Sequence, residues 1–288
     1  MIHLSAFADE ISPDLDEQIA ALQAENIHYV DLRGAWDVNV LDLSDEQVAQ
    51  IKHALDAHGI GVAAIASPVG KVPIDTPLEE QLRRLDRAIE LAQTFQASYI
   101  RIFSFYPPGY GSALDLAPSK LARSPDHAAW RAEVIARLRA FSGRAGAAGI
   151  TLLHENDAGT YGDIIARCVD VLQNIDDPHL QAVLDPANFI QCRQTPYPDA
   201  YEQVRPWLGY VHVKDALADG KVVSAGEGVA RWPELLRRLR EDGYDGFFSL
   251  EPHLISMGQY GGFSGPSLFR QASQAFQSLL KATDWAYE

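Results

Sequence analysis

The stretch ITLLHENDAG, from Ile150 to Gly159, begins as a buried strand and ends in a run of polar residues. Its first half is apolar and mostly branched, a composition typical of a strand covered on both faces. Its second half reads His-Glu-Asn-Asp. A turn explains Asn156 and Asp157, because both residue types favour turns. It does not explain the pair His154 and Glu155 at the last strand positions, so this strand end needs another explanation.

Seven other short segments share the apolar, β-branched or aromatic composition of Ile150–Leu153. They are Ile2–Phe7, Ile27–Leu32, Ile60–Ala66, Tyr99–Phe105, Leu180–Leu184, Leu208–Val213 and Phe247–Leu250. Helical periodicity separates them, most clearly in the stripe Leu78, Leu82, Leu85, Ile89 and Ala92. Helix starts are indicated by Pro13, by Ser44 with Gln47, by Pro77 and by Pro233, and helix ends by Gly59, Gly149 and Gly243.

Strands that alternate with helices favour parallel pairing, and eight such units favour a closed barrel. We therefore predict an α/β fold, a single (β/α)8 TIM barrel that spans residues 1–288 as one domain. Its active site should lie at the carboxyl ends of the strands. An open doubly wound sheet is the alternative. The turn SAFADEISPD after the first strand argues against it, because it lacks the GxGxxG fingerprint of a dinucleotide-binding fold.

Two connections are longer than a barrel needs. One runs from Tyr106 to about Ser124, and the other from Pro252 to about Gly265. Both follow a strand, so both should lie over the C-terminal face of the barrel. Their aromatic residues are flanked by glycines, which favours lids that cover a ligand. Decorative loops or oligomer contacts are the alternative.

The composition of the whole chain narrows the class of protein. The 288 residues are 47% hydrophobic and carry a formal net charge of -15. This acidity argues against nucleic acid or an anionic membrane as a partner, and it suits an enzyme of small metabolites. The N-terminal MIHLSAFADE has no basic region, and no apolar run approaches the ~18 residues of a membrane span. Cys168 and Cys192 form no CxxC pair, so we expect ordinary thiols in the cytoplasm.

Four consecutive strands of the predicted barrel deliver a carboxylate or a histidine to the same level. Glu155 ends the fifth strand in LLHEN, and Asp185 ends the sixth in AVLDPAN. His212 lies on the seventh in GYVHVKD, and Glu251 ends the eighth in FFSLEPH. In a barrel these strand ends face one shared mouth. Each residue alone has a structural explanation, such as a turn or a helix cap, but the joint pattern indicates a common site.

Three carboxylates that converge in a partly dry mouth repel one another and lose hydration. Something cationic must offset this cost. Protonation, Lys214 or an arginine could do so, and a divalent metal does it best. Three oxygen ligands and one imidazole suit one divalent metal ion, Mn²⁺, Mg²⁺, Co²⁺ or Zn²⁺.

These motifs resemble those of the xylose-isomerase-like barrel superfamily, whose members include ketose 3-epimerases, hydroxypyruvate isomerase, inosose dehydratase and the endonuclease IV type. The resemblance extends over essentially the whole chain. It is best carried by LLHEN, VLDPAN, YVHVKDA, SAGEG and GFFSLEPH. It implies that Glu155, Asp185, His212 and Glu251 bind one divalent metal. It also implies that Glu155 and Glu251 act as the acid/base pair of an isomerase or epimerase of a keto-sugar or sugar phosphate, which works through an enediolate.

Further residues at the predicted mouth are candidates for substrate binding. Lys214 lies two residues after His212, so strand alternation points both inward, although a charge partner for Glu251 or Asp185 is equally consistent. Asn188 stands three residues after Asp185, where relatives often have a histidine. The remaining candidates are Asn156, Arg33, Glu10, Trp36 and His253.

Two nearby residues receive no substrate role. Alternation in YIRIFSF does not tell which residues face inward, so the direction of Arg101 stays open. His154 is adjacent to Glu155 and should face the helix layer, which favours a structural role.

Three other functions compete with an isomerase. A DNA nuclease of the endonuclease IV type needs more histidines than this acidic chain offers, and GEG after His212 supplies none. A dehydratase of a cyclic keto-polyol, of the inosose or dehydroshikimate type, shares the barrel, the metal and the first proton abstraction, so the sequence does not separate it. A non-catalytic sugar-binding barrel would not need two carboxylates beside a metal. The identity of the sugar or polyol, the metal and a homo-oligomeric state stay open.

Overall fold

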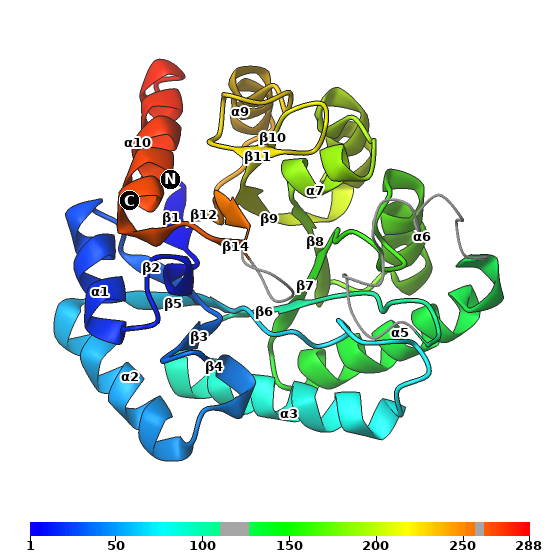
Figure 1. Cartoon of the computed structure of the whole chain (residues 1–288). Coiled ribbons are helices and arrows are strands. Elements are labelled where there is room, and N and C mark those ends of the chain that lie inside the picture. Colours follow the sequence, from blue (N-terminus) through cyan, green and yellow to red (C-terminus); the bar gives the residue numbers. More distant parts are fainter. Residues whose placement is uncertain (110–126, 257–261) are drawn as a thin grey trace.

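The computed structural model describes residues 1–109, 127–256 and 262–288. Eight parallel strands close into a barrel in the order β1-β12-β9-β8-β7-β6-β5-β2 (Figure 1). The prediction of a single (β/α)8 TIM barrel is confirmed. The barrel strands are β1 (His3–Ala6), β2 (Tyr29–Leu32), β5 (Gly61–Ile65), β6 (Tyr99–Ile102), β7 (Thr151–Glu155), β8 (Leu180–Leu184), β9 (Leu208–Val213) and β12 (Phe247–Leu250).

Several barrel strands are shorter than the predicted segments, and β6 is shortened most. β6 ends at Ile102 because the next residues bond to the loop after β5, with Phe103 N 2.8 Å from Val69 O. β7 ends at Glu155, as the sequence predicts, because its last residues still pair with β8, where Glu155 is opposite Val183. Glu155 is therefore held by the sheet itself, which fixes the direction of its side chain.

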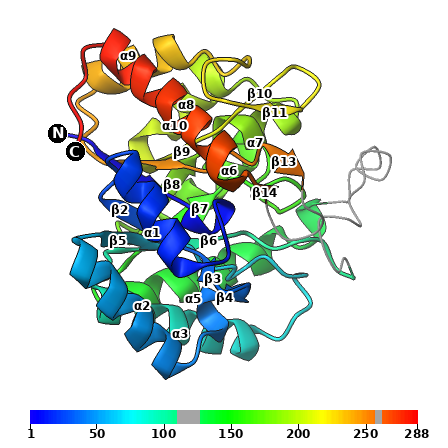
Figure 2. The ribbon, with the colours of Figure 1, turned by 60° about the vertical axis from the view of Figure 1, so that its left-hand side comes forward.

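Helices surround the barrel on the outside (Figures 1 and 2). They are α1 (Leu15–Ala24), α2 (Asp45–His58), α3 (Leu78–Phe95), α5 (Arg131–Ala147), α6 (Ile165–Ile175), α7 (Pro186–Gln191), α8 (Tyr201–Val204), α9 (Trp232–Glu241) and α10 (Gly265–Ala282). α2 starts and ends as its sequence predicts: Ser44 and Gln47 form a capping box, and Gly59 closes the helix in the left-handed conformation. α1 begins at Leu15, behind Asp14 as N-cap.

Three short hairpins follow barrel strands on the side of their carboxyl ends. They are β3 (Gly34–Ala35) with β4 (Val38–Asn39), β10 (Asp215–Ala216) with β11 (Val222–Val223), and β13 (Ile255–Ser256) with β14 (Gly262–Phe263). Most of the first predicted lid, and the centre of the second, lie outside the described residues. The two ends of the chain meet, since Ile2 pairs with Tyr287 beside β1 (Figure 2).

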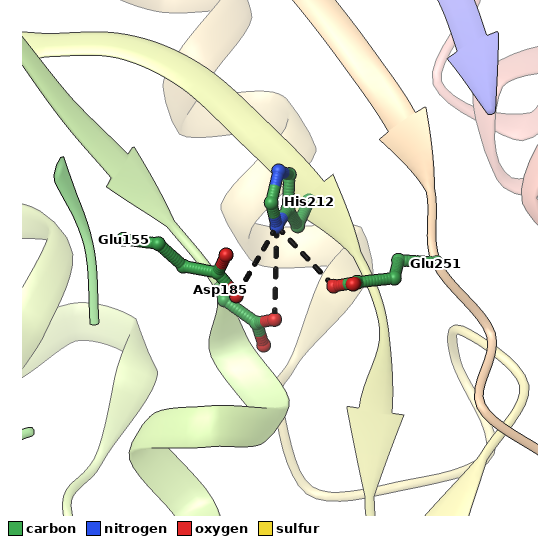
Figure 3. Close-up of side chains that lie close together, drawn as sticks. All are labelled: Glu155, Asp185, His212 and Glu251. Atoms are coloured by element: carbon green, nitrogen blue, oxygen red, sulfur yellow. Dashed lines mark ion pairs between the residues drawn. The ribbon is translucent and has the colours of Figure 1, made fainter. Parts of the chain in front are cut away.

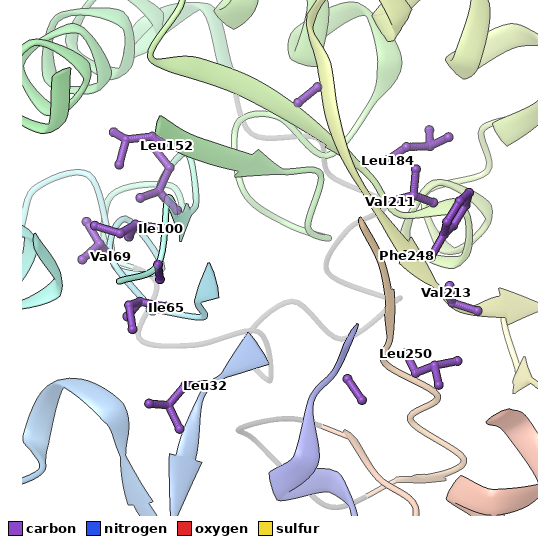
Figure 4. Close-up of a cluster of buried hydrophobic side chains, with 14 of the residues drawn as sticks. Leu32, Ile65, Val69, Ile100, Leu152, Leu184, Val211, Val213, Phe248 and Leu250 are labelled. Carbon is purple, nitrogen blue, oxygen red and sulfur yellow. The ribbon is translucent and has the colours of Figure 1, made fainter. Parts of the chain in front are cut away.

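Strand alternation sorts the barrel side chains into two apolar clusters. The larger cluster fills the space between strands and helices and includes Leu152, Val211 and Phe248 (Figure 4). The smaller one lies inside the barrel and includes Leu153 and Tyr210, each one residue from a member of the outer set. The inner positions of the same strands continue toward the carboxyl ends of the barrel. No helix of the described residues has the length and apolarity to cross a membrane.

Candidate metal centre

Four neighbouring elements place the predicted ligands at one level of the barrel (Figure 3). Glu155 is the last residue of β7, and His212 lies within β9. Asp185 follows β8 and caps α7, because its side chain accepts a hydrogen bond from Asn188 N. Glu251 follows β12 directly. All four residues are buried, with at most 2% of the surface of each residue exposed.

The three carboxylates converge on one nitrogen of the imidazole. His212 Nδ1 lies 3.6 Å from Glu155 Oε1, 3.9 Å from Asp185 Oδ2 and 3.3 Å from Glu251 Oε2 (Figure 3). One ligand atom from each of the four residues lies within 4.8 Å of all the others. This spacing is compatible with a single ion that all four residues contact.

The unpaired atoms of the cluster fit a metal ion. Asp185 Oδ2 and His212 Nδ1 are buried and make no hydrogen bond, although both have ion-pair neighbours. Buried polar atoms are normally hydrogen-bonded, so each unpaired one needs an explanation. A carboxylate oxygen and an imidazole nitrogen without hydrogen bonds, beside two further carboxylates, form a donor set that a hard or borderline divalent cation prefers.

The charges of the cluster shift its protonation equilibria. Burial disfavours an imidazolium, but Glu155 and Glu251 outweigh burial and raise the pKa of His212 to about 10. Burial also opposes ionisation of Glu155, yet Arg101 and His212 lower its pKa to about 2. Lys214 leads the cations that overcome burial and hold the pKa of Glu251 well below its usual range. The imidazole proton thus acts as a counter-charge, and a bound metal would replace it, because a metal ligand must be the neutral imidazole.

Lys214 bridges two of the predicted ligands. Its Nζ lies 2.8 Å from Asp185 Oδ2 and 3.1 Å from Glu251 Oε2, and the side chain is 2% exposed. Burial opposes the ammonium charge, but Asp185 and Glu251 dominate and raise the pKa of Lys214. The structure therefore contains the ion pairs of Lys214 with Asp185 and Glu251 that the sequence left as an alternative. A substrate contact by Lys214 stays a prediction.

Two asparagines hold ligands in place. Asn188 Nδ2 donates to Glu155 Oε1 at 3.0 Å. Asn156 spans 29 residues to pair with the backbone of Asp185, donating to its carbonyl oxygen and accepting from its N–H, both at 3.0 Å. Both residues thus orient ligand-bearing groups, as the surroundings of metal sites often do. Their substrate contacts stay predictions.

Arg33 and His253 contact the carboxylate oxygen of Glu251 that does not face His212, Oε1. Arg33 Nη1 lies 3.5 Å from Glu251 Oε1, and His253 Nε2 lies 3.4 Å from the same atom. His253 also binds the fully buried Glu10, with Nε2 3.0 Å from Oε1 and its backbone N–H donating to Oε2 at 2.9 Å. Glu10, Glu251 and His253 could hold another metal by spacing alone. Arg33 lies 4.0 Å from Glu10 Oε1 and already supplies a positive charge there.

Trp36 is the predicted substrate residue with the least connection to the cluster. It lies between β3 and β4 with a positive φ of 55°, is partly buried and packs against the main core. Its backbone N–H donates to Pro13 O at 2.5 Å. A stacking role of Trp36 on a sugar stays a prediction.

The sequence did not single out Phe7 and left the direction of Arg101 open, and both residues contact the cluster. Phe7, at the end of the first strand, is fully buried and meets the His212 ring edge-on at a centroid distance of 5.2 Å. The Arg101 and Arg33 guanidinium carbons each lie 5.1 Å from the Phe7 ring centroid. Arg101 faces the inside of the barrel, a direction that the alternation of residues in YIRIFSF left open. An aromatic residue at a strand end was the available signal for Phe7.

The chain belongs to the xylose isomerase-like TIM barrel family, whose model matches residues 19–279. Among solved structures it is similar to a D-tagatose 3-epimerase-like protein, with 15% identity, a TM-score of 0.75 and 98% of each chain covered. It is also similar to a xylose isomerase-like TIM barrel protein from Mycobacterium smegmatis in complex with magnesium, with 20% identity, a TM-score of 0.72 and coverage of 98% and 97%.

A third similar structure is the probable 3-DHS dehydratase AsbF from Bacillus anthracis. It shares 17% identity and a TM-score of 0.71, and the alignment covers 96% of this chain and 99% of that one. At such identities these likenesses establish the fold. No curated protein sequence matches the chain.

Proposed function

We propose that this protein is a divalent-metal-dependent isomerase or epimerase of a keto-sugar or sugar phosphate. The observation that carries the proposal is the convergence of Glu155, Asp185 and Glu251 on Nδ1 of His212. A divalent metal bound by these four residues would polarise a substrate carbonyl. The magnesium complex of a similar barrel supports a metal here, and Mn²⁺, Co²⁺ and Zn²⁺ suit the same donors.

We assign the proton transfers of this reaction to Glu155 and Glu251. They come from β7 and β12, with β8 and β9 between them in the barrel, and their carboxylates approach His212 from opposite sides (Figure 3). In the proposed reaction one glutamate removes the proton beside the substrate carbonyl. The other glutamate, which has taken up a proton beforehand, gives that proton to the opposite face, which inverts the carbon and exchanges the protonation states of the two glutamates. A positioned acid or base of this kind contributes ~10²–10⁴-fold to the rate.

The test is turnover of a panel of ketoses and ketose phosphates with Mn²⁺ in deuterated water. An isomerase or epimerase incorporates deuterium beside the carbonyl and releases no water from the substrate. Glu155→Gln and Glu251→Gln should each lower turnover by about 10²–10⁴-fold, because each removes one proton-transfer group. Glu46→Gln, an exposed change on α2, should leave turnover at the wild-type rate. Absence of both turnover and exchange over the whole panel would contradict the proposal.

A dehydratase of a cyclic keto-polyol is the second candidate, and the similarity to AsbF over 96% of the chain supports it. It begins with the same proton abstraction but then expels a hydroxyl group. Inosose and dehydroshikimate in the same panel would therefore lose water. A non-catalytic sugar-binding barrel would bind a panel member without exchange. A small-molecule substrate follows from either enzyme, while a cytoplasmic location and a homo-oligomer stay predictions.

A further inference from the structure

Arg101 lies between the two proposed acid/base residues. It extends inward from β6, and its side chain is 8% exposed. Its Nη1 lies 3.2 Å from Glu155 Oε2 and 3.6 Å from Glu251 Oε1. A single guanidinium nitrogen thus reaches both carboxylates, although the two residues are far apart in the chain and stand on separate strands.

In each of the two glutamates, one carboxylate oxygen faces His212 and the other faces Arg101. Glu155 Oε1 and Glu251 Oε2 face His212, and these are the oxygens that Figure 3 joins to the imidazole by dashed lines. The second oxygen of each, Glu155 Oε2 and Glu251 Oε1, faces Arg101, and Glu251 Oε1 also contacts Arg33 and His253. If the first oxygens bind a metal, the second oxygens are those left to carry a proton. Arg101 therefore lies where the reacting part of a substrate must come.

The guanidinium is held in position by groups other than the glutamates. It packs over Phe7 at 5.1 Å and over Phe103 at 4.9 Å, measured from its central carbon to the ring centroids. Among the described residues its one hydrogen bond runs from Nη2 to Ala66 O at 3.3 Å. Glu155 Oε2 accepts no hydrogen bond, and the buried Arg101 Nε donates none. The cation is thus fixed, while part of its donor capacity is unused.

The charge balance of the cluster favours the same conclusion. Arg101 is the cation that contacts the second oxygens of both proposed proton-transfer glutamates. Arg33 reaches only Glu251 Oε1, at 3.5 Å, and it also pairs with Asp9 and Glu10. A positive charge between the two glutamates can stabilise an anionic group in the transition state.

We propose that Arg101 binds the anionic oxygen that develops on the substrate during proton transfer, which makes it a further catalytic residue. The inference rests on the proposed function. A glutamate oxygen takes the proton from the carbon beside the carbonyl, the electron pair of the broken C–H bond forms a C=C bond, and the carbonyl π pair moves to the oxygen. A guanidinium N–H donates a hydrogen bond to that oxygen and keeps its own proton. The other glutamate then protonates carbon, and the oxygen returns to its uncharged form.

The competing explanation is that Arg101 only neutralises buried carboxylates. The two explanations differ in what Arg101→Ala changes. A transition-state contact lowers kcat and leaves KM nearly unchanged, because the ground-state carbonyl carries little charge. A mere counter-ion leaves turnover unchanged once the metal is bound. In either case removal of a cation beside the site should not weaken Mn²⁺ binding, which calorimetric titration measures independently of activity.

The experiment compares wild type, Arg101→Ala, Arg101→Lys and Arg137→Ala with Mn²⁺ on the substrate that wild type turns over. Arg137 is the matched control, since it is equally buried, pairs with Glu133 and packs over Phe105 at 5.4 Å in α5. Arg101→Ala should lose about 10²–10³-fold in kcat, as the loss of one oxyanion donor does. Guanidinium chloride, below unfolding concentrations, should restore part of that loss, and ammonium chloride should restore none. Arg101→Lys should stay folded and be impaired, because an ammonium lacks the planar fork.

Each result decides the matter. Equal kcat in wild type and Arg101→Ala overturns the inference and leaves the proposed function intact. A loss in Arg101→Ala without guanidinium rescue, together with weaker Mn²⁺ binding, also overturns it, because the role is then structural. Wild type that turns over no substrate overturns the proposed function and, with it, this role of Arg101.

Discussion

His154 and Glu155 are neighbours in β7 with opposite chemistry, because strand alternation turns one toward the site and the other toward the surrounding layer. His154 is 1% exposed, and its Nε2 has no hydrogen-bond partner among the described residues. Its ring packs so closely against Gly162 that a Cβ there would lie 2.5 Å from His154 Cε1. Burial lowers the pKa of His154 to about 4, so the residue is neutral in the folded protein near pH 7.

This burial makes stability depend on pH in a defined direction. The unfolded chain takes up a proton on His154 below pH ~6.5, whereas the folded protein does so only near pH 4. The contribution of neutral His154 to the free energy of unfolding is therefore complete above pH ~6.5 and is lost as the pH falls toward 4. Between pH 7.5 and pH 5 it amounts to about 2 kcal/mol. Urea unfolding at the two pH values should show that wild type loses more stability than His154→Gln, and the difference should equal this amount.

The matched control is His53→Gln, because His53 is an exposed histidine of α2. This variant should follow the wild-type pH dependence. If His154→Gln loses as much stability as wild type between the two pH values, His154 is not the buried neutral group that the fold describes.

At the scale of the element, the connection from β9 to α9 is organised by one carboxylate. Asp215 Oδ1 accepts from Ala216 N at 2.8 Å and from Ala230 N at 3.1 Å, and Oδ2 accepts from Gly226 N and Gly228 N, both at 3.0 Å. A Cβ on Gly228 would lie 2.2 Å from Asp215 Oδ1, so glycine is required for this approach. The loop begins directly after Lys214, and its order supports the position of that side chain.

Asp215→Asn should loosen this loop. The amide replaces one acceptor oxygen by a donor that faces two backbone N–H groups, and hydrogen bonds to a charged group contribute about 1.5–3 kcal/mol each. We expect a loss of about 2–4 kcal/mol and faster hydrogen exchange at Gly226 and Gly228. Asp219→Asn, at an exposed turn of the same loop, should leave these amides protected. Unchanged protection in Asp215→Asn would show that the carboxylate does not hold the loop.

The elements were predictable from the sequence because their signals are local. All eight barrel strands follow from short β-branched segments, and the start of α2 follows from the spacing of Ser44 and Gln47. The convergence of Glu155, Asp185, His212 and Glu251 was also predictable, since a barrel places equivalent strand ends at one level.

The contacts around the cluster were not predictable, because they join distant residues through side-chain geometry. Glu10 and His253 meet across 243 residues, and Asn156 reaches the backbone of Asp185 rather than the mouth. Alternate residues of a strand point to opposite faces, and the sequence of this strand alone does not tell which set faces the barrel axis. The inward direction of Arg101 therefore could not be predicted. These are the contacts that distinguish one member of a fold family from another.

At the scale of the whole molecule, a metal ion would join strands that are far apart in the sequence. The four ligands span residues 155 to 251, so the complete site exists only in the folded barrel. A ligand that binds only the folded state stabilises it by about 2.7 kcal/mol at a free concentration a hundred times its Kd. For a chain of this size that corresponds to a rise in Tm of about 4–5 °C. Calorimetry of EDTA-treated protein, with and without Mn²⁺, measures this rise.

Asp185→Asn separates binding at this site from binding elsewhere. The Asn oxygen can still cap α7, so the helix start is retained, but the second ligand oxygen and its charge are lost. The variant should therefore unfold at a temperature that Mn²⁺ barely changes. An equal rise in wild type and variant would place the stabilising ion outside the cluster. No rise in either protein would mean that the three carboxylates are neutralised by Lys214, Arg101 and the His212 proton alone, which is the counter-charge that a metal must displace.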